Sequence, residues 1–329
     1  MWRLNGQKSR SVGRVITHPS KTKTDVPMSQ PRPLPLVDTH AHVNLEDFSF
    51  DLEAFLDRSQ RGIFPEIKGR QTTDPVFRPF ISGLIVPGVD LASSLRAVEL
   101  AHKYDFVFAA VGFHPNHVSQ ATQDDWEECV RLAFDDPKSN KIVALGETGL
   151  DCYWDYTPIE RQRDFLLQTL DLGLRAQLPV VIHSRETNEE IMATLRDFYA
   201  TAPRYSSEPN CGVVHSFSGT PEQAEELIDL GFYLGFGGFV TYTSKKFSDL
   251  WEVAKRVPVD RILLETDCPF LTPHPLRGKL ERNEPLTTIF VAKRLAELRD
   301  ASIPEIVNQT TQNAIRLFKL PPLRETPID

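Results

Sequence analysis

The stretch "LPLVDTHAHV", residues 34–43, is an apolar run that ends in two histidines one residue apart. Successive side chains of a β-strand point to opposite faces, so His40 and His42 would share one face at the end of such a strand. Neutral imidazole is the commonest metal ligand in proteins. The pair is typical of a metal site, but isolated histidines are more often structural or surface residues. The rest of the sequence has to decide between these interpretations.

Seven further apolar runs, rich in β-branched residues, follow the first one and alternate with segments of helical character. They occupy residues 81–89, 106–115, 141–151, 178–185, 211–219, 232–240 and 261–269. Several are apolar at consecutive positions, as in parallel strands that are covered on both faces. Eight strand candidates, nearly all followed by a helix, predict an α/β fold of the (β/α)8 TIM-barrel type. A doubly wound open sheet is the alternative, but no Gly-rich phosphate loop follows the first run.

Helix-start signals lie between these runs. Leu91, Leu95 and Val98 recur at helical spacing and predict the apolar face of a helix. Four capping boxes predict helix N-termini: "TPIE" at Thr157, with Pro158 in the first helical position, "TNEE" at Thr187, "TPEQ" at Thr220 and "SIPE" at Ser302. The tail after residue 283 is expected to add two more helices.

The composition bounds the class of protein. The chain has 329 residues, 40% of them hydrophobic, and no apolar run near the roughly 20 residues that span a bilayer. Its four cysteines show no C-x-x-C spacing, which argues against a zinc ribbon and fits a reducing compartment. We therefore expect a cytoplasmic protein without a membrane partner, and favour a monomer. The net charge of −8 excludes a basic coat for nucleic acid, so any such substrate needs a local site.

Residues 1–34 differ from the remainder. They are basic and Pro-rich, without an acid in residues 1–24, and predict a disordered N-terminal extension before a single barrel domain at 35–329. Within that domain, residues 61–80 form a Gly/Pro-rich insertion. Its four basic residues are either phosphate contacts on a rim loop or part of a solvated surface loop: Arg61, Lys68, Arg70 and Arg78.

Metal-capable side chains stand at the carboxyl ends of five of the eight runs: His40, His42, Glu147, His183, His215 and Asp267. In a barrel these ends converge on one face, where active sites form. Each residue alone has another explanation, such as a turn, a helix cap or a core imidazole. Their shared position predicts that all six meet in one cavity as a metal site.

Six ligands are too many for one catalytic ion, which typically takes three from the protein. We therefore expect two divalent cations, with Glu147 as the bridge between them. His40, His42 and Asp267 are assigned to one cation, and His183 and His215 to the other. Two dications outweigh two carboxylates, so the site would attract an anionic substrate despite the acidic net charge.

An ordered set of motifs resembles the TatD family of metal-dependent deoxyribonucleases, from about Val37 to Leu320. These are "DTHAH", "GFHP", "GETGLD" with the downstream "ERQ", "VVIHSR", "VVHSFSG", and "ETDCPFLTP" followed by "RGK" and "RNEP". The resemblance implies a TIM-type barrel of the metal-dependent hydrolase superfamily and the same six ligands. It also implies DNase activity, commonly exonucleolytic, with Mg²⁺, Mn²⁺ or Zn²⁺. The acidic surface further suggests single strands or DNA ends as the substrate.

The expected reaction is phosphodiester hydrolysis by a hydroxide held between the cations. Asp267, Glu147 and His114 are the expected catalytic residues: Asp267 would take a proton from the attacking water, and His114 would contact the phosphate or the leaving group. Arg185 and Arg277 are candidates for binding phosphate. Phe217 or Tyr153 could stack on a base, but an aromatic side chain near a barrel mouth is more often part of the packing.

Three alternatives stay open at this point. The first is another hydrolase of the superfamily, acting on an amide, a lactone or an aminoacyl ester. The second is a non-catalytic barrel that binds nucleic acid or a protein, against which the complete set of six ligands argues. The third is a nuclease for RNA, because nothing in the sequence reports a preference about the 2′-hydroxyl.

Overall fold

A computed structural model describes residues 31–65, 67, 76–135, 137–202 and 211–328. Eight strands form one parallel sheet in chain order: β1 Arg32–Asp38, β2 Phe77–Pro87, β3 Val107–Val111, β4 Ile142–Asp151, β5 Val180–Arg185, β6 Gly212–Val214, β7 Phe232–Phe236 and β8 Ile262–Leu264. Each overlaps one of the eight predicted runs, and β1 and β2 begin before their runs do. Most of the predicted N-terminal extension falls outside the described residues.

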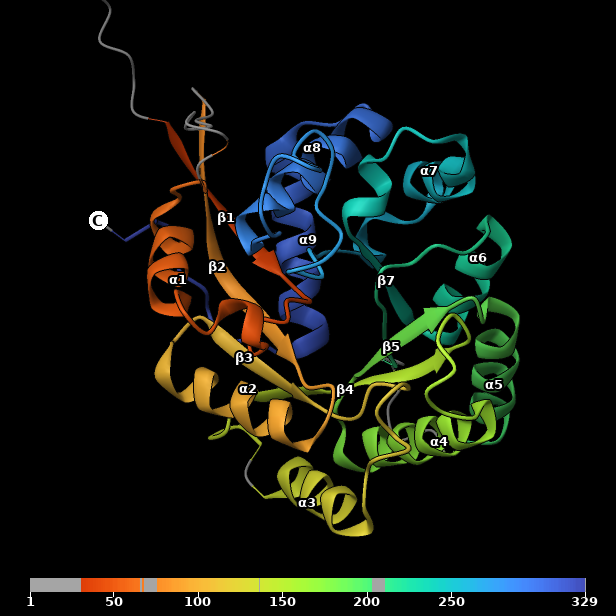
Figure 1. Ribbon diagram of the computed structural model, residues 1–329. Helices are drawn as coiled ribbons and strands as arrows, with labels where there is room; N and C mark the ends of the chain where they lie inside the picture. Colours follow the sequence, from red (N-terminus) through yellow and green to blue (C-terminus); the bar gives the residue numbers. More distant parts are fainter. Residues whose placement is uncertain (1–30, 66, 68–75, 136, 203–210, 329) are drawn as a thin grey trace, which may run out of the picture. The chain divides into compact units, whose positions relative to one another are not determined.

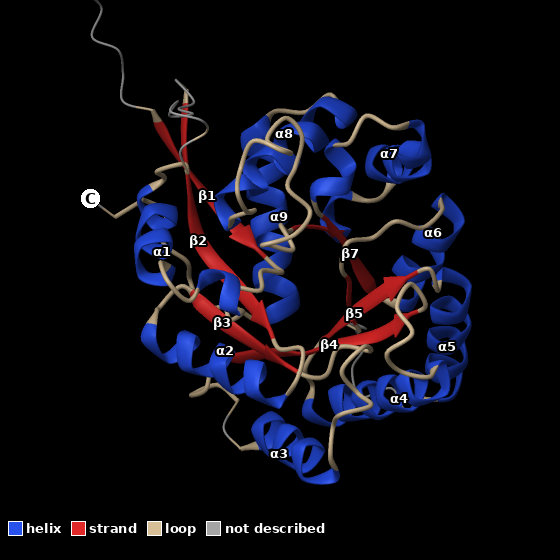
Figure 2. Cartoon of the chain, viewed as in Figure 1, coloured by secondary structure: helices blue, strands red, loops and turns tan. Residues whose placement is uncertain are grey.

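Helices follow the strands and lie outside the ring that the strands form (Figures 1 and 2). They are α1 Leu52–Arg61, α2 Leu91–Lys103, α3 Gln123–Phe134, α4 Ile159–Ala176, α5 Asn188–Thr201, α6 Pro221–Leu230, α7 Ser248–Arg256, α8 Thr288–Arg299 and α9 Ile303–Phe318. The ring closes between the last strand and the first, because the backbone N–H and the hydroxyl of Thr39 both donate to the Leu264 carbonyl at 3.0 Å. The predicted (β/α)8 barrel is confirmed.

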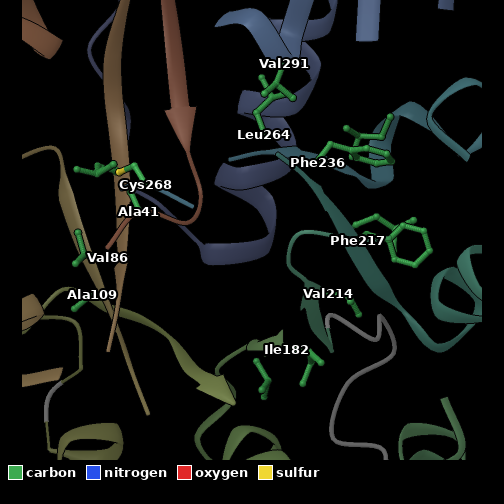
Figure 3. Close-up of a cluster of buried hydrophobic side chains, with 14 of the residues drawn as sticks. Ala41, Val86, Ala109, Ile182, Val214, Phe217, Phe236, Leu264, Cys268 and Val291 are labelled. Carbon is green, nitrogen blue, oxygen red and sulfur yellow. The ribbon is translucent and has the colours of Figure 1, made fainter. Parts of the chain in front are cut away.

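Every strand divides its side chains between two apolar clusters, as a two-residue repeat requires. The smaller cluster draws on all eight strands: Val37, Ile85, Phe108, Val143, Val181, Val213, Tyr233 and Leu263. Their neighbours along the strands, such as Val180 and Ile182, belong to the larger cluster together with helix residues. Figure 3 shows part of the larger cluster, with Leu264 of β8 next to Val291 of α8. The smaller cluster therefore fills the barrel, and the larger one joins the strands to the helices.

Helix α9 covers the amino-terminal end of the barrel. Leu317 and Phe318 at its end belong to the inner cluster. The Asn313 side chain donates to the carbonyl of Ile262, the first residue of β8, at 2.8 Å. This end of the barrel is therefore filled by apolar groups, and the opposite, carboxyl end carries the polar side chains.

Two of the predicted capping boxes are confirmed and two are wrong. Thr220 and Ser302 cap α6 and α9 with reciprocal side-chain bonds. Thr157 does not cap α4, which begins at residue 159 with Pro158 as the N-cap. Instead, the Gln162 side chain holds this loop by donating to the Thr157 carbonyl at 2.8 Å. Thr187 is the N-cap of α5, but its hydroxyl donates to the Leu150 carbonyl at 3.0 Å instead of closing a box.

One further prediction needs correction, and one open alternative can be narrowed. Leu95 is not part of the buried face of α2, since it is 42% exposed, and small residues such as Ala97 pack inward instead. The described ends of the insertion, residues 61–65 and 76–80, lie between the end of α1 and the start of β2, at the amino-terminal end of the barrel, which favours the surface-loop alternative for Arg61 and Arg78. Arg61 pairs there with Asp57, and Arg78 donates to the Arg61 carbonyl. Lys68 and Arg70 lie outside the described residues.

No helix within the described ranges is both long and apolar enough to cross a membrane. The cytoplasmic location and the monomeric state stay predictions from the sequence.

Candidate metal centre

The six predicted ligands come together at the carboxyl end of the barrel. They are supplied by β4 and β5 and by the residues that follow β1, β6 and β8: His40, His42, Glu147, His183, His215 and Asp267. Strand alternation explains why several of them point inward. His183 lies two residues after Val181 of the inner cluster, and His215 two residues after Val213. The sheet therefore aims these imidazoles into the barrel mouth.

Glu147 is the centre of this cluster, and its two carboxylate oxygens face different histidines. Its Oε2 lies 3.2 Å from His40 Nε2 and 3.3 Å from His42 Nε2. Its Oε1 lies 2.7 Å from His183 Nδ1 and 2.9 Å from His215 Nε2. Such a division of the two oxygens between two groups of nitrogen donors is what a bridging carboxylate needs.

Asp267 completes the first group, with its Oδ1 3.7 Å from His40 Nε2 and 3.5 Å from His42 Nε2. The sequence had placed these three residues on one cation, and the structure brings them within reach of one another. The Asp267 side chain is 15% exposed, whereas the Glu147 side chain is 2% exposed. Asp267 is thus the carboxylate that a molecule entering from solvent can reach.

The donor set fits divalent cations. Ring nitrogens approach closely in pairs, His40 Nε2 with His42 Nε2 at 3.1 Å and His183 Nδ1 with His215 Nε2 at 3.2 Å. Imidazole nitrogens and carboxylate oxygens at such spacing are ligand types that zinc, manganese and related ions accept. These residues could therefore hold a metal.

Electrostatics in the cluster attract positive charge. Burial by itself would raise the pKa of Glu147, but the surrounding imidazoles, His215 and His40 foremost, hold that pKa well below its usual range. Burial would lower the pKa of His42, but hydrogen bonds to Asp267 and Glu147 raise it to about 9. The Glu147 charge likewise keeps the pKa of His215 well above its usual value despite burial. Cations that bind here would displace protons from these histidines.

A family model described as TatD related DNase matches residues 37–319 of the sequence. The chain belongs to the TatD-related DNase family. A relative named uncharacterized metal-dependent hydrolase YabD, from Bacillus subtilis strain 168, is 38% identical over 87% of this chain and 99% of its own length. One named 3'-5' ssDNA/RNA exonuclease TatD, from Erwinia tasmaniensis, is 31% identical over 73% of this chain and 89% of its own.

A solved structure agrees with this assignment. The crystal structure of YjjV, a TatD homolog from Escherichia coli K12, superposes with a TM-score of 0.72 at 32% identity, covering 87% of this chain and 98% of that one. The TatD-family chain is accordingly a metal-dependent hydrolase.

Two carboxylates orient histidines of this TatD-family site, and the sequence analysis predicted neither of them. Asp151 Oδ2 lies 3.0 Å from His183 Nε2, on the side of the ring away from Glu147. Glu265, fully buried, accepts from the Ser216 backbone N–H, and its Oε1 lies 3.7 Å from His215 Nδ1. Metal-binding histidines commonly give their second ring N–H to such carboxylates, which fix the ring and its tautomer.

A signal for Glu265 was present in the sequence. It lies two residues after the inward-facing Leu263 and two before Asp267, so alternation places it on the same side. Asp151 is the last residue of the "GETGLD" motif, of which only Glu147 was predicted to be a site residue.

Replacing Glu265 with Gln is expected to weaken metal affinity by about 10- to 100-fold, because His215 loses the charge that orients it. Gly235 supports this role, since a Cβ there would come within 2.2 Å of Glu265 Oε2. Competition with a chelator measures the affinity, and Glu225→Gln, an exposed change on α6, serves as the control. Unchanged affinity in the Glu265 variant would contradict the role.

The other predicted site residues do not all join the six-residue cluster. His114 joins the cluster, with its Nε2 3.7 Å from Glu147 Oε1. Arg185 and Arg277 are exposed; their guanidinium groups lie over the rings of Tyr153 and Tyr242, at 3.7 and 4.6 Å. Within the described part of the chain, no ion pair or hydrogen bond joins either arginine to the six-residue cluster. Of the two alternatives for Phe217, packing is the one the structure supports, because this side chain is buried in the outer core.

Proposed function

We propose that this TatD-family chain hydrolyses the phosphodiester bonds of DNA, acting on single strands or ends. The observation that carries the proposal is the division of the two Glu147 oxygens between two sets of imidazoles. Two-cation sites of this kind occur in nucleases and phosphatases, and also in aminopeptidases, so the site fits phosphodiester hydrolysis and the substrate test has to exclude amides. The name of the Erwinia tasmaniensis relative, a single-stranded DNA and RNA exonuclease, supports the same substrate class.

Two divalent cations, Mg²⁺, Mn²⁺ or Zn²⁺, are the proposed cofactors. His40, His42 and Asp267 would hold one of them together with Glu147 Oε2, while His183 and His215 would hold the other with Oε1. When bound, the cations act as Lewis acids that neutralise charge on the phosphate and make water more acidic.

Asp267 is the proposed proton acceptor for the attacking water. Burial would raise its pKa, but the hydrogen bond to His42 and the charges on neighbouring histidines lower it. The carboxylate is therefore ionised near neutral pH and can accept a proton, and its partial exposure lets water reach it. A positioned base of this kind contributes about 10²- to 10⁴-fold to a hydrolysis rate.

His114 is proposed as a hydrogen-bond donor to the phosphate or the leaving oxygen, and its contacts define its tautomer. Its Nδ1 accepts from the backbone N–H of Asn116 at 3.1 Å, so the proton of the neutral ring is on Nε2. Burial, with the charge of His183, lowers the pKa of His114 to about 3, so the ring is neutral near pH 7. Because Nε2 carries the proton, this atom donates into the site and is not offered as a metal ligand.

His114→Ala is expected to lower kcat by about 10- to 100-fold while the bound metal content stays the same. His114→Gln, whose amide nitrogen can replace Nε2–H, should recover part of that loss. Initial rates and metal analysis of both variants check this. A variant that loses metal would instead make His114 a ligand.

Arg277, on the loop after β8, is proposed to bind a phosphate of the substrate strand. Its guanidinium is exposed and fixed over the Tyr242 ring, and the Tyr242 hydroxyl donates to the Thr272 carbonyl at 3.2 Å. A guanidinium held in this way can give two parallel hydrogen bonds to a phosphate.

The function is tested by digestion of end-labelled single-stranded and duplex DNA, and of RNA in parallel. The protein is first stripped of metal, and Mg²⁺, Mn²⁺ or Zn²⁺ is then added back. We expect metal-dependent release of nucleotides from the ends of single strands. Absence of cleavage with metal stoichiometrically bound would overturn the proposal and leave ester or amide hydrolysis as the function of the site.

A further inference from the structure

Three aromatic side chains lie exposed on the loop between β4 and α4, and we call them the aromatic trio: Tyr153, Trp154 and Tyr156. They are 49%, 42% and 61% exposed. The Trp154 and Tyr156 rings are stacked at 5.4 Å with an interplanar angle of 8°, and Tyr153 meets Trp154 edge-on at 4.8 Å. Large aromatic rings gathered on a surface, with little core packing to account for them, mark a binding site.

A positive charge accompanies these rings. The Arg185 guanidinium lies 3.7 Å from the centre of the Tyr153 ring and 5.9 Å from that of Trp154. Arg185 is exposed, and no carboxylate among the described residues forms an ion pair with it. Aromatic rings beside a free cationic group are the combination with which proteins bind single-stranded nucleic acid, where bases stack and the cation meets the backbone.

Hydrogen bonds tie the trio to the metal centre. The backbone N–H groups of Tyr153 and Trp154 donate to Asp151 Oδ1 at 2.9 and 3.2 Å. The other oxygen of the same carboxylate is 3.0 Å from His183 Nε2. The Cys152 N–H also donates to the Arg185 carbonyl at 3.0 Å. One carboxylate thus separates the trio from a proposed metal ligand, and this part of the loop is held in place.

We propose that the aromatic trio is a stacking platform for unpaired bases of the substrate, next to the phosphate that is cleaved, and that Arg185 binds a neighbouring phosphate. This subsite rests on the proposed hydrolysis of DNA. It takes nucleobases of any sequence, because every base has a flat π face. Bases inside a duplex are stacked on each other and cannot use it, so the platform selects single strands.

The charges on the loop favour bases over phosphates on the rings. Asp155 lies exposed between Trp154 and Tyr156 and repels the backbone from that part of the loop. The cation stands at the opposite end of the trio, over Tyr153. A strand would therefore lay its bases on the rings and its phosphate on Arg185.

The test separates stacking from simple contact area. Trp154→Leu and Tyr156→Leu keep an apolar side chain but remove the flat ring, while Trp154→Phe and Tyr156→Phe keep a ring. Phe134→Leu, at a 47% exposed position on α3, is the matched control. All variants change exposed side chains, and thermal melting confirms that they fold. Each is assayed with metal on a short oligothymidylate and on a strand of the same length whose sugars carry no bases.

Each Leu variant is expected to raise KM for the oligothymidylate about tenfold, with kcat unchanged, since one base stack is worth about that factor. The Phe variants and the Phe134 control should match the parent protein. On the strand without bases, all variants should behave alike, with a KM above that of any single Leu variant on the oligothymidylate, because every stack is lost at once. This pattern supports the platform, because only base recognition changes.

Two results would overturn the proposal in different ways. Leu variants that cleave the oligothymidylate with the parent KM would reject the platform and leave DNA hydrolysis intact. A parent protein that neither cleaves nor binds either strand would reject the proposed function, and the platform with it. Binding of a dye-labelled oligothymidylate to metal-free protein, followed by fluorescence anisotropy, separates these cases because it does not depend on catalysis.

Discussion

Glu147→Gln is expected to reduce hydrolysis by about 10³-fold or more, which corresponds to ~4 kcal/mol in the activation barrier. The carboxylate meets four imidazoles with its two oxygens. Glutamine keeps the shape and one oxygen, but it offers an N–H₂ group to two of those imidazoles and carries no charge. Both proposed metal positions are therefore affected by one substitution, and the bound metal should fall below half of that in the parent protein.

Metal analysis after dialysis, together with initial rates at several metal concentrations, measures both effects. Glu225→Gln on α6 removes an exposed carboxylate and should change neither. If Glu147→Gln retained its full metal content and activity, the cluster would not be the reaction centre. Loss of activity with full metal content would assign Glu147 to the chemistry and not to the binding of cations.

The centre could be anticipated from the sequence because two simple rules act together. Strand alternation fixes which residues point inward, and a barrel brings the ends of all eight strands to one face. Residues as distant as His40 and Asp267 are thereby placed together without any knowledge of loops. The backbone bears this out directly, since the Asp267 N–H donates to the His40 carbonyl at 2.9 Å.

The groups that orient the ligands were harder to foresee. Nothing in the chemistry of a lone carboxylate distinguishes Asp38 from a surface acid, yet it is fully buried, accepts from the His40 N–H at 3.2 Å and from the Thr266 hydroxyl at 2.6 Å. It thereby joins the loops after β1 and β8. Such roles depend on distances between side chains of different loops, and periodicity along one strand does not contain that information.

Loop conformations could not be predicted from the sequence for a related reason. The "TPIE" pattern has the sequence of a capping box. The neighbouring Gln162 side chain instead fixes the loop, because it hydrogen-bonds to the Thr157 carbonyl and to the Asp151 backbone. A tertiary contact thus competes with the local motif. For the insertion of residues 61–80, basic composition alone could not decide between a phosphate contact and a surface loop, whereas the position of its described ends between α1 and β2 favours the surface loop.

Asp267→Asn is expected to lower kcat by about 10²- to 10⁴-fold, because an amide cannot accept a proton from the attacking water. The pH profile should change as well. Since the pKa of Asp267 lies below its usual value, the parent protein keeps the base ionised above that pKa and loses activity as the pH falls through it. The Asn variant should show no such decline from this group.

Metal concentration separates the two roles that this position combines. An amide oxygen is a weaker ligand than a carboxylate, so part of the loss in Asp267→Asn reflects weaker binding at the site shared with His40 and His42. Raising the metal concentration until binding is saturated removes that part. A deficit that persists at saturation, without the acidic limb of the pH profile, identifies Asp267 as the base. Full recovery would instead make it a ligand alone, and the proton would have to leave directly to solvent.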